Sequence, residues 1–169
     1  ELYGLSSGAV ISAVDLIQGI GIYAGFELIK VEGATGLYDT NYEGKAKAAV
    51  DALQRVDVVY LHIEASDEAG HEGNVDLKIK TIEYLDKRIV KTLMEETEQM
   101  EEEVALALLP DHPTPCEVRT HVHDPVPFVI VRPGEASDAV EKYDEDSVSK
   151  GHFGTIEGDQ FIKALLGKL

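Results

Sequence analysis

The sequence contains no tryptophan, a single cysteine and few basic residues. With one cysteine, Cys116, the chain cannot form an internal disulfide, which fits the reducing environment of the cytoplasm. Its 15 lysines and arginines are outnumbered by 32 aspartates and glutamates, which gives a formal charge of −17. Because nucleic acids and anionic membranes attract clustered positive charge, we expect no nucleic-acid partner and no membrane partner. The surplus of carboxylates is compatible with bound cations, although the acidic run 95–103 is typical of a solvated surface.

An apolar run long enough to cross a membrane is also missing. The most apolar stretch, residues 9–29, is interrupted by Asp15, Gln18, Gly19, Gly21 and Glu27. It therefore predicts a core helix and a strand instead of a membrane span. No signal peptide is visible. Since the chain opens with Glu1 and passes at once into sequence typical of a folded domain, we expect further protein upstream.

The remaining composition is that of a folded globular protein. Hydrophobic residues make up 44% of the chain, which argues against disordered and fibrous classes. A chain of 169 residues can bury a substantial core, and we find no repeat or linker in it. We therefore expect residues 1–169 to form a single domain.

Hydrophobic spacing predicts alternating helices and strands. We expect strands at residues 26–31, 57–63, 104–109 and 127–131. We expect helices at residues 8–24, 40–53, 75–93 and 159–166. Ser6 or Ser7 is the expected cap of the first helix, Thr40 with Glu43 has capping-box spacing for the second, and Asn74 precedes the third. Residues 134–151 are expected to form an exposed acidic loop that is partly helical.

This alternation places the chain in the α/β class, with a largely parallel sheet between two helical layers. In such three-layer α/β/α sheets, ligands bind beyond the carboxyl ends of the strands. The most polar clusters of the sequence directly follow predicted strands, so we expect the functional site at that edge.

The first polar cluster, residues 62–74, follows the predicted strand 57–63. Asp67 and His71 are four residues apart, which on a helical turn puts a carboxylate and an imidazole on one face. Together they can bind one divalent ion. Gly70 and Gly73 would allow the backbone to turn tightly beside it.

Two further clusters carry possible metal ligands. Asp111 and His112 follow the predicted strand 104–109, and they can share an ion only if the chain leaves strand geometry there. His121 and His123 lie just before the last predicted strand. Either could bind metal, and His123 could instead act as an acid or base.

Several other polar residues have more than one interpretation. We interpret His62 as structural because it lies inside an apolar strand, and Ser66 as a turn residue instead of a nucleophile. Glu64 and Glu72 could orient ligand histidines or could simply be exposed. We expect Cys116 to be an inert, partly buried thiol.

The order of these motifs resembles the alkaline phosphatase superfamily, and within it archaeal cofactor-independent phosphoglycerate mutase. The motifs that carry the resemblance are DEAGH at 67–71, DHPTP at 111–115, and His121 followed by PVPF at 125–128. GAVISAV at 8–14, GATG at 33–36 and DTNYEGK at 39–45 are also similar to that family. The resemblance therefore spans nearly the whole chain.

The resemblance implies a distal half of an alkaline phosphatase-like catalytic domain with two divalent metal ions. Asp67, His71 and His121 would hold one ion, and Asp111 and His112 would help hold the other. Other family ligands, including the serine that accepts the phosphoryl group, would lie in the upstream half of the same protein. An inserted substrate-binding domain is also expected there. Because a phosphoenzyme needs the upstream serine, this chain alone should be inactive.

For the intact enzyme, the resemblance implies interconversion of 3-phosphoglycerate and 2-phosphoglycerate through a phosphoserine, without 2,3-bisphosphoglycerate. Thr35, Asn41 and Lys45 could help shape the loop that binds this small phosphorylated acid, although helix capping also explains Asn41. The alternatives are a phosphohydrolase or phosphonopyruvate decarboxylase-like relative, and a non-catalytic metal-binding fragment. Mixed oxygen and imidazole ligands suit manganese, zinc, cobalt or, less well, magnesium. The sequence gives no indication of the oligomeric state.

Overall fold

The computed structural model describes residues 3–169, which pack as two compact units. The first unit consists of the chain up to residue 99 together with residues 114–120, and the second consists of residues 100–113 and 121–169. The expectation that residues 1–169 form a single domain stays a prediction. Among the described residues, no helix is both long and apolar enough to cross a membrane.

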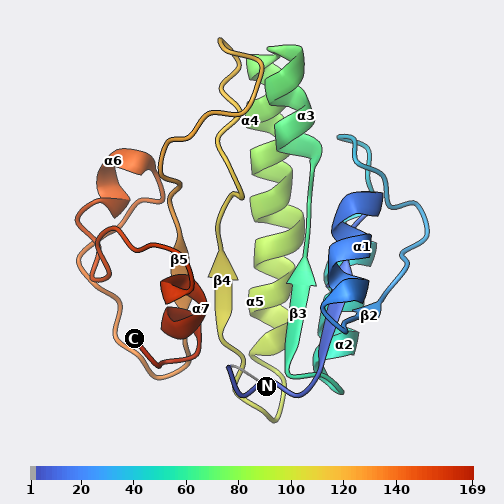
Figure 1. Ribbon diagram of the computed structural model, residues 1–169, viewed down its shortest axis with the longest axis vertical. Helices are drawn as coiled ribbons and strands as arrows, with labels where there is room; N and C mark the ends of the chain where they lie inside the picture. Colours follow the sequence, from blue (N-terminus) through green and yellow to red (C-terminus); the bar gives the residue numbers. More distant parts are fainter. Residues whose placement is uncertain (1–2) are drawn as a thin grey trace. The chain divides into compact units, whose positions relative to one another are not determined.

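The first unit is built on a parallel sheet, as the alternating pattern predicted (Figure 1). Its strands are β1 (Gly8–Ile11), β2 (Glu27–Leu28) and β3 (Val58–Leu61), in the order β2-β1-β3. Ala9, Val10 and Ile11 are almost completely buried, because β1 lies between the other two strands. The predicted strands 26–31 and 57–63 are confirmed, although both are shorter than expected.

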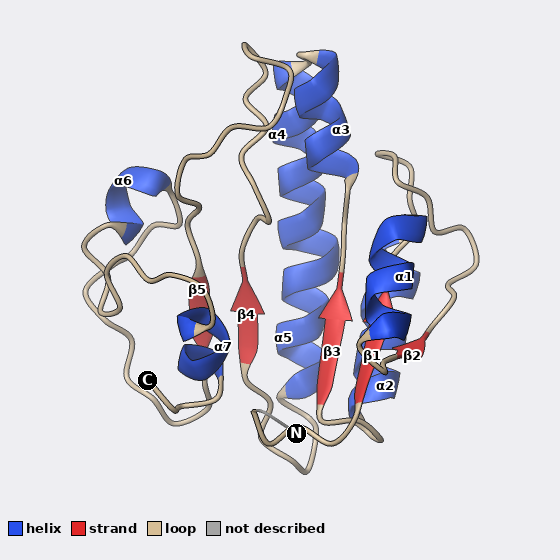
Figure 2. Ribbon diagram, viewed as in Figure 1, coloured by secondary structure: helices blue, strands red, loops and turns tan. Residues whose placement is uncertain are grey.

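The predicted helix over residues 8–24 is wrong in its first half. Residues Gly8–Ile11 form β1, and helix α1 begins only at Asp15 and ends at Tyr23 (Figure 2). The spacing of Val10, Val14 and Ile17 fits a helix, but the four consecutive small or apolar residues are all buried. A run that is buried on both faces favours a central parallel strand.

Helices lie on both faces of this sheet. On one face, α1 approaches so closely that a Cβ at Gly21 would collide with Val10. The next residue along β1, Ile11, pairs in register with Leu61. Because neighbouring strand residues point to opposite faces, Leu61 lies on the other face, where it packs against the Tyr42 cluster of helix α2 (Tyr42–Leu53). The first unit therefore has the predicted helix-sheet-helix layers.

The predicted helix over 75–93 is confirmed and continues to residue 97. It consists of α4 (Val75–Tyr84), a π-helical segment η1 (Leu85–Val90) and α5 (Lys91–Thr97). Asn74 caps it as expected, because its side chain accepts a hydrogen bond from Leu77 N at 3.1 Å. Helix α2 is also confirmed, but Asn41 is its cap instead of Thr40, accepting from Gly44 N at 2.9 Å.

The second unit contains an antiparallel pair of strands. β4 (Leu106–Leu108) and β5 (Val129–Val131) lie within the predicted strands, and their antiparallel pairing departs from the parallel pattern of the first unit. Helices α6 (Glu145–Val148) and α7 (Gln160–Leu165) follow, in agreement with the expected partly helical loop and final helix. The ring of the partly buried Phe128 contacts the rings of Phe153 and Phe161 in this unit.

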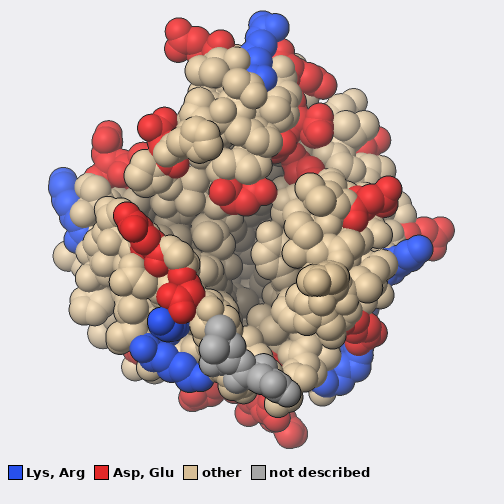
Figure 3. All heavy atoms as spheres, in the orientation of Figure 1, with Lys and Arg blue, Asp and Glu red and all other residues tan. Residues whose placement is uncertain are grey.

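Acidic side chains are spread over the face seen in Figure 3, and lysine and arginine side chains are fewer and scattered.

Candidate metal centre

The central element of the candidate site is helix α3 (Ala65–Glu72), which begins four residues after β3 ends. It starts with hydrogen bonds from Asp67 N and Glu68 N to the carbonyl oxygen of Glu64, at 2.8 and 3.2 Å. It ends at Gly73, whose φ of +69° lies in the left-handed region that favours glycine. The strand and this cap fix a short helix at the carboxyl edge of the sheet, where parallel sheets bind ligands.

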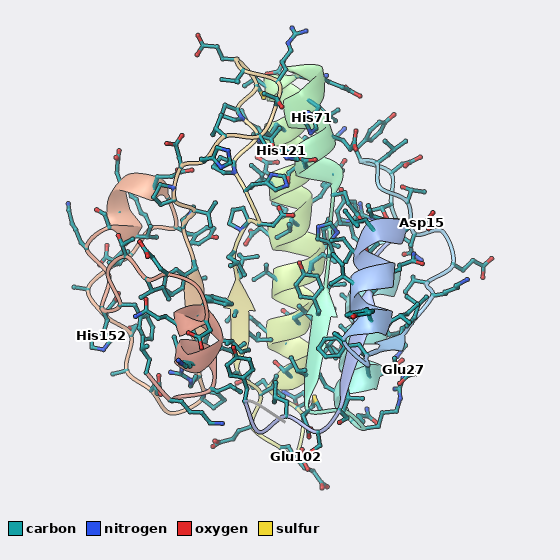
Figure 4. All side chains as sticks on the ribbon, in the orientation of Figure 1. Asp15, Glu27, His71, Glu102, His121 and His152 are labelled. Carbon is teal, nitrogen blue, oxygen red and sulfur yellow. The ribbon has the colours of Figure 1, made fainter. Side chains whose placement is uncertain are left out.

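Asp67 and His71 lie on one face of α3, as their spacing predicted (Figure 4 labels His71). Asp67 Oδ2 and His71 Nε2 are 3.4 Å apart. Two ligand atoms of one tetrahedral zinc ion are about 3.3 Å apart, because each lies about 2.0–2.1 Å from the metal. The pair therefore has a geometry that fits two ligands of a shared ion as well as a simple ion pair.

Residues 114–120 orient both side chains. Thr114 Oγ1 donates a hydrogen bond to Asp67 Oδ1, and His71 Nδ1 lies 3.1 Å from the carbonyl oxygen of Arg119. Since a carbonyl oxygen can only accept, Nδ1 carries a proton, so in the neutral imidazole Nε2 is the nitrogen that can bind a cation. A metal-binding histidine is typically held by such a bond from its other ring nitrogen. The donor set and its support thus fit a divalent cation.

This segment approaches α3 closely because two positions of the helix end are glycine. A Cβ at Gly70 would collide with the carbonyl oxygen of Thr114, and one at Gly73 would collide with the Arg119 side chain. Lys78 on α4 also holds the segment by donating to that Thr114 oxygen at 2.6 Å. Arg119 itself has a φ of +58°, which is uncommon for a residue other than glycine. Both glycines were expected to let the backbone turn tightly. Gly73 has the left-handed φ of such a turn, whereas Gly70 is helical and instead permits the close approach of Thr114.

The second unit brings three other predicted ligands together. Asp111 and His112 lie in a bend after β4, so the chain does leave strand geometry where the prediction required it. Asp111 Oδ2 is 3.4 Å from His112 Nε2, and the rings of His112 and His121 stack with centroids 3.5 Å apart. His123 lies nearby in the sequence and is exposed.

The predicted substrate residues lie in and beside the loop before α2. Thr35 N donates to Thr40 Oγ1, and the Asn41 amide donates to the carbonyl oxygen of Glu32 at 2.8 Å. Lys45 is 0% exposed, and its ammonium pairs with Glu64. Lys45 Nζ also donates to the carbonyl oxygen of Thr35 at 3.4 Å, so this buried lysine holds the loop from inside the protein. Thr35 and Asn41 shape the loop, and their contact with substrate stays a prediction.

Sequence reasoning missed a buried polar network next to α3. Ser12, which directly follows β1, donates to Glu64 Oε1 at 2.9 Å, and His62 Nδ1 lies 3.1 Å from the same oxygen. The sequence positions of Ser12, His62 and Glu64 could have revealed this network. Ser12 and His62 directly follow adjacent parallel strands, and Glu64 comes two residues after His62. This network agrees with the structural interpretation of His62. Glu64 was expected either to orient a metal-binding histidine or to be exposed, and it orients His62 instead.

The network is not a nucleophilic triad. Ser12 Oγ and Glu64 Oε1 both approach the same ring nitrogen of His62, at 3.3 and 3.1 Å. A triad requires the serine and the carboxylate on opposite nitrogens of the imidazole. Burial by itself would raise the pKa of Glu64, but the hydrogen bond with His62 and the positive charge of Lys45 outweigh it and lower this pKa to about 2. Glu64 is therefore a buried, permanently ionised anchor at neutral pH.

Cys116 is half-buried, and its Sγ lies 4.0 Å from the carbonyl oxygen of Ala69. This placement agrees with the expected partly buried thiol and adds a weak contact between residues 114–120 and α3.

Comparison with known proteins places this geometry in a family. The sequence model described as "Metalloenzyme superfamily" matches residues 3–166. A protein of Methanosarcina acetivorans named 2,3-bisphosphoglycerate-independent phosphoglycerate mutase is 53% identical over 98% of the chain. A Geobacter sulfurreducens protein named as a probable enzyme of this kind is 49% identical over 99% of the chain. The chain covers only 42% of each of these two proteins.

A solved structure has the same fold. The PH0037 protein from Pyrococcus horikoshii is similar with a TM-score of 0.87 and 35% identity, over 99% of this chain and 51% of that one. The likeness supports the predicted alkaline phosphatase-like α/β fold. Together with the match over residues 3–166, it shows that the chain belongs to the Metalloenzyme superfamily.

Proposed function

We propose that this chain is the carboxyl-terminal part of a cofactor-independent phosphoglycerate mutase, in which both compact units belong to one metal-binding catalytic domain. The observation that carries the proposal is the pair formed by Asp67 Oδ2 and His71 Nε2, 3.4 Å apart, with the other polar atom of each side chain held by residues 114–120. The proposed substrate is taken from the names of relatives that are about half identical to the chain.

In this proposal Asp67, His71 and His121 hold one divalent ion, and Asp111 and His112 hold part of a second. The covalent chain supports His121 as the third ligand. It follows Arg119, the residue that accepts from His71, by two positions. Two peptide units span at most about 7.6 Å between Cα atoms, so His121 is tethered within reach of the pair.

Manganese, zinc, cobalt or magnesium ions would neutralise charge on the transferring phosphoryl group and lower the pKa of the nucleophile. The residues of this chain would hold those ions in one coordination geometry. His123, which is exposed, would exchange a proton with the substrate hydroxyl, and Thr35 and Asn41 would shape the loop beside it. The nucleophilic serine, further ligands and the substrate-grasping domain would come from the upstream half.

A chimaera tests this function directly. The portion of the Methanosarcina acetivorans relative that matches this chain is replaced by residues 1–169, and conversion of 3-phosphoglycerate to 2-phosphoglycerate is measured with added Mn²⁺ and without 2,3-bisphosphoglycerate. We expect mutase activity without release of inorganic phosphate. The 169-residue chain alone should be inactive.

The variant Asp67→Asn in the chimaera should lower kcat/KM by at least about 10²–10³-fold, the loss typical of removing a group that stabilises transition-state charge. Release of phosphate in place of isomerisation would indicate a phosphohydrolase. A folded chimaera that binds metal but converts no substrate would favour a non-catalytic metal-binding role for this chain.

A further inference from the structure

Among the described residues of the first unit, the most deeply buried charges form an ion pair beside the candidate metal centre. Lys45 Nζ lies 3.3 Å from Glu64 Oε2, and the two side chains are 0% and 6% exposed. Lys45 also donates to the carbonyl oxygens of Thr35 and His62, at 3.4 and 3.3 Å. The ammonium thus has three acceptors, as a buried lysine requires.

Glu64 is held from three directions by donors on different elements. Ser12 follows β1, Lys45 lies on α2 and His62 follows β3. The backbone of the same residue begins α3, because its carbonyl oxygen accepts from Asp67 N at 2.8 Å. One residue therefore connects the sheet and α2 to the first turn of the helix that carries Asp67 and His71.

We propose that Glu64 is a positioning residue for the metal ligands of α3, acting through the Lys45 ion pair and the Ser12 and His62 hydrogen bonds. The inference rests on the proposed metal-binding function. Glu64 and Lys45 cannot themselves contact substrate, because both are buried and bonded to protein groups. Their effect on the site must pass through the backbone of α3.

Physical considerations favour positioning over stability as the role of this network. A buried ion pair gives little net stability, because the desolvation of two charges offsets their attraction. Directional hydrogen bonds from three elements, however, fix the carboxylate in one place. Groups that orient metal ligands typically change metal affinity by about 10–100-fold when they are removed.

The test is a Co²⁺ titration of the 169-residue chain, followed by its visible absorption, for the wild type, Glu64→Gln, Glu64→Ala and Asp67→Asn. Each variant is first shown to be folded by circular dichroism and thermal melting. The matched control is Arg88→Met, which removes the ion pair between Arg88 of η1 and Glu43 of α2. Ser12→Ala serves as a milder variant if Glu64→Ala does not fold.

We expect Glu64→Gln to weaken Co²⁺ binding about 10-fold and Glu64→Ala by up to about 100-fold, with a changed absorption band at saturation. Ser12→Ala should weaken it less, and Arg88→Met should leave affinity and spectrum unchanged. Folded Glu64 variants with wild-type affinity and spectrum would overturn the positioning role while leaving the metal centre intact. A wild-type chain that binds Co²⁺ no better than Asp67→Asn would overturn the proposed metal function, and the positioning role with it.

Discussion

At the scale of single residues, Glu64 carries the clearest electrostatic consequence of the fold. Its carboxylate is surrounded by Ser12, Lys45 and His62, and its pKa falls from the ordinary value of 4.5 to about 2 on folding. A carboxyl group whose pKa is lower in the folded state stabilises that state above its unfolded pKa. The stabilisation is lost as the pH falls from about 4.5 toward 2.

We therefore predict that protonation of Glu64 in acid lowers the free energy of unfolding by roughly 3 kcal/mol, at about 1.36 kcal/mol per unit of pKa. Urea unfolding at pH 7, 4.5 and 3 measures it. Because other carboxyl groups, such as those of Glu43 and Asp57, also have lowered pKa values, the quantity to compare is the difference between wild type and Glu64→Gln. That difference should shrink as the pH falls, and a constant difference would contradict the assigned pKa.

Thr114 offers a second test at residue scale. Its side chain is 3% exposed and donates to Asp67 Oδ1, so it holds the carboxylate without touching the proposed ion. Thr114→Val removes the hydroxyl at nearly constant volume and should weaken divalent metal binding about 10-fold. Thr114→Ser keeps the donor and is the control. Equal affinities of the valine and serine variants, measured by calorimetry, would exclude this role.

At the scale of elements, the decisive contact is between α3 and residues 114–120. Gly70 lets this segment come close, because a Cβ there would meet the carbonyl oxygen of Thr114. The same oxygen accepts from Lys78, so it cannot move without cost. The position therefore requires glycine for packing, although its backbone is helical.

Gly70→Ala should lower the free energy of unfolding by about 1–3 kcal/mol, as overpacking does in other proteins, and should weaken metal binding. Gly19→Ala is the matched control. Gly19 lies inside α1, nothing lies within 4 Å of its added Cβ, and alanine there should raise stability by up to about 1 kcal/mol. Chemical denaturation of both variants checks the pair, and a neutral Gly70→Ala would show that residues 114–120 adjust freely.

Most elements could be predicted from hydrophobic spacing, and the failures have physical causes. The long helix from residue 75 could be predicted, because its apolar residues recur at helical spacing and Asn74 marks its start. The first strand was predicted as helix, because residues 8–11 show no alternation when both faces are buried. The antiparallel pairing of β4 with β5 depends on contacts distant in sequence, which local spacing does not encode.

The site could be predicted from the sequence only where its residues lie close together along the chain. Asp67 and His71 are ligand types at helical spacing, and the structure places their polar atoms 3.4 Å apart. The Glu64 network was not predicted, because Ser12 and Lys45 come from segments 52 and 19 residues away. A short list of ligand residues could thus be read from motifs, but the residues that hold them in place could not.

At the scale of the whole molecule, the chain spans less than half the length of the two mutase-named relatives described above. The proposed ligands belong to both compact units, with Asp67 and His71 in one and Asp111, His112 and His121 in the other. In the proposed function, the remaining ligands of the second ion come from the longer protein, so we expect the chain alone to retain one ion. This is why activity and metal content must be measured in the chimaera.

The central claim is that these five residues hold two divalent ions, and metal content tests it most directly. The chimaera is purified, equilibrated with Mn²⁺ or Zn²⁺, passed through a desalting column and analysed by mass spectrometry of the elements. We predict two ions per chain in the wild type, and one ion in each of the folded variants Asp67→Asn and Asp111→Asn. A wild-type chain without bound metal, or variants that keep both ions, would contradict the account.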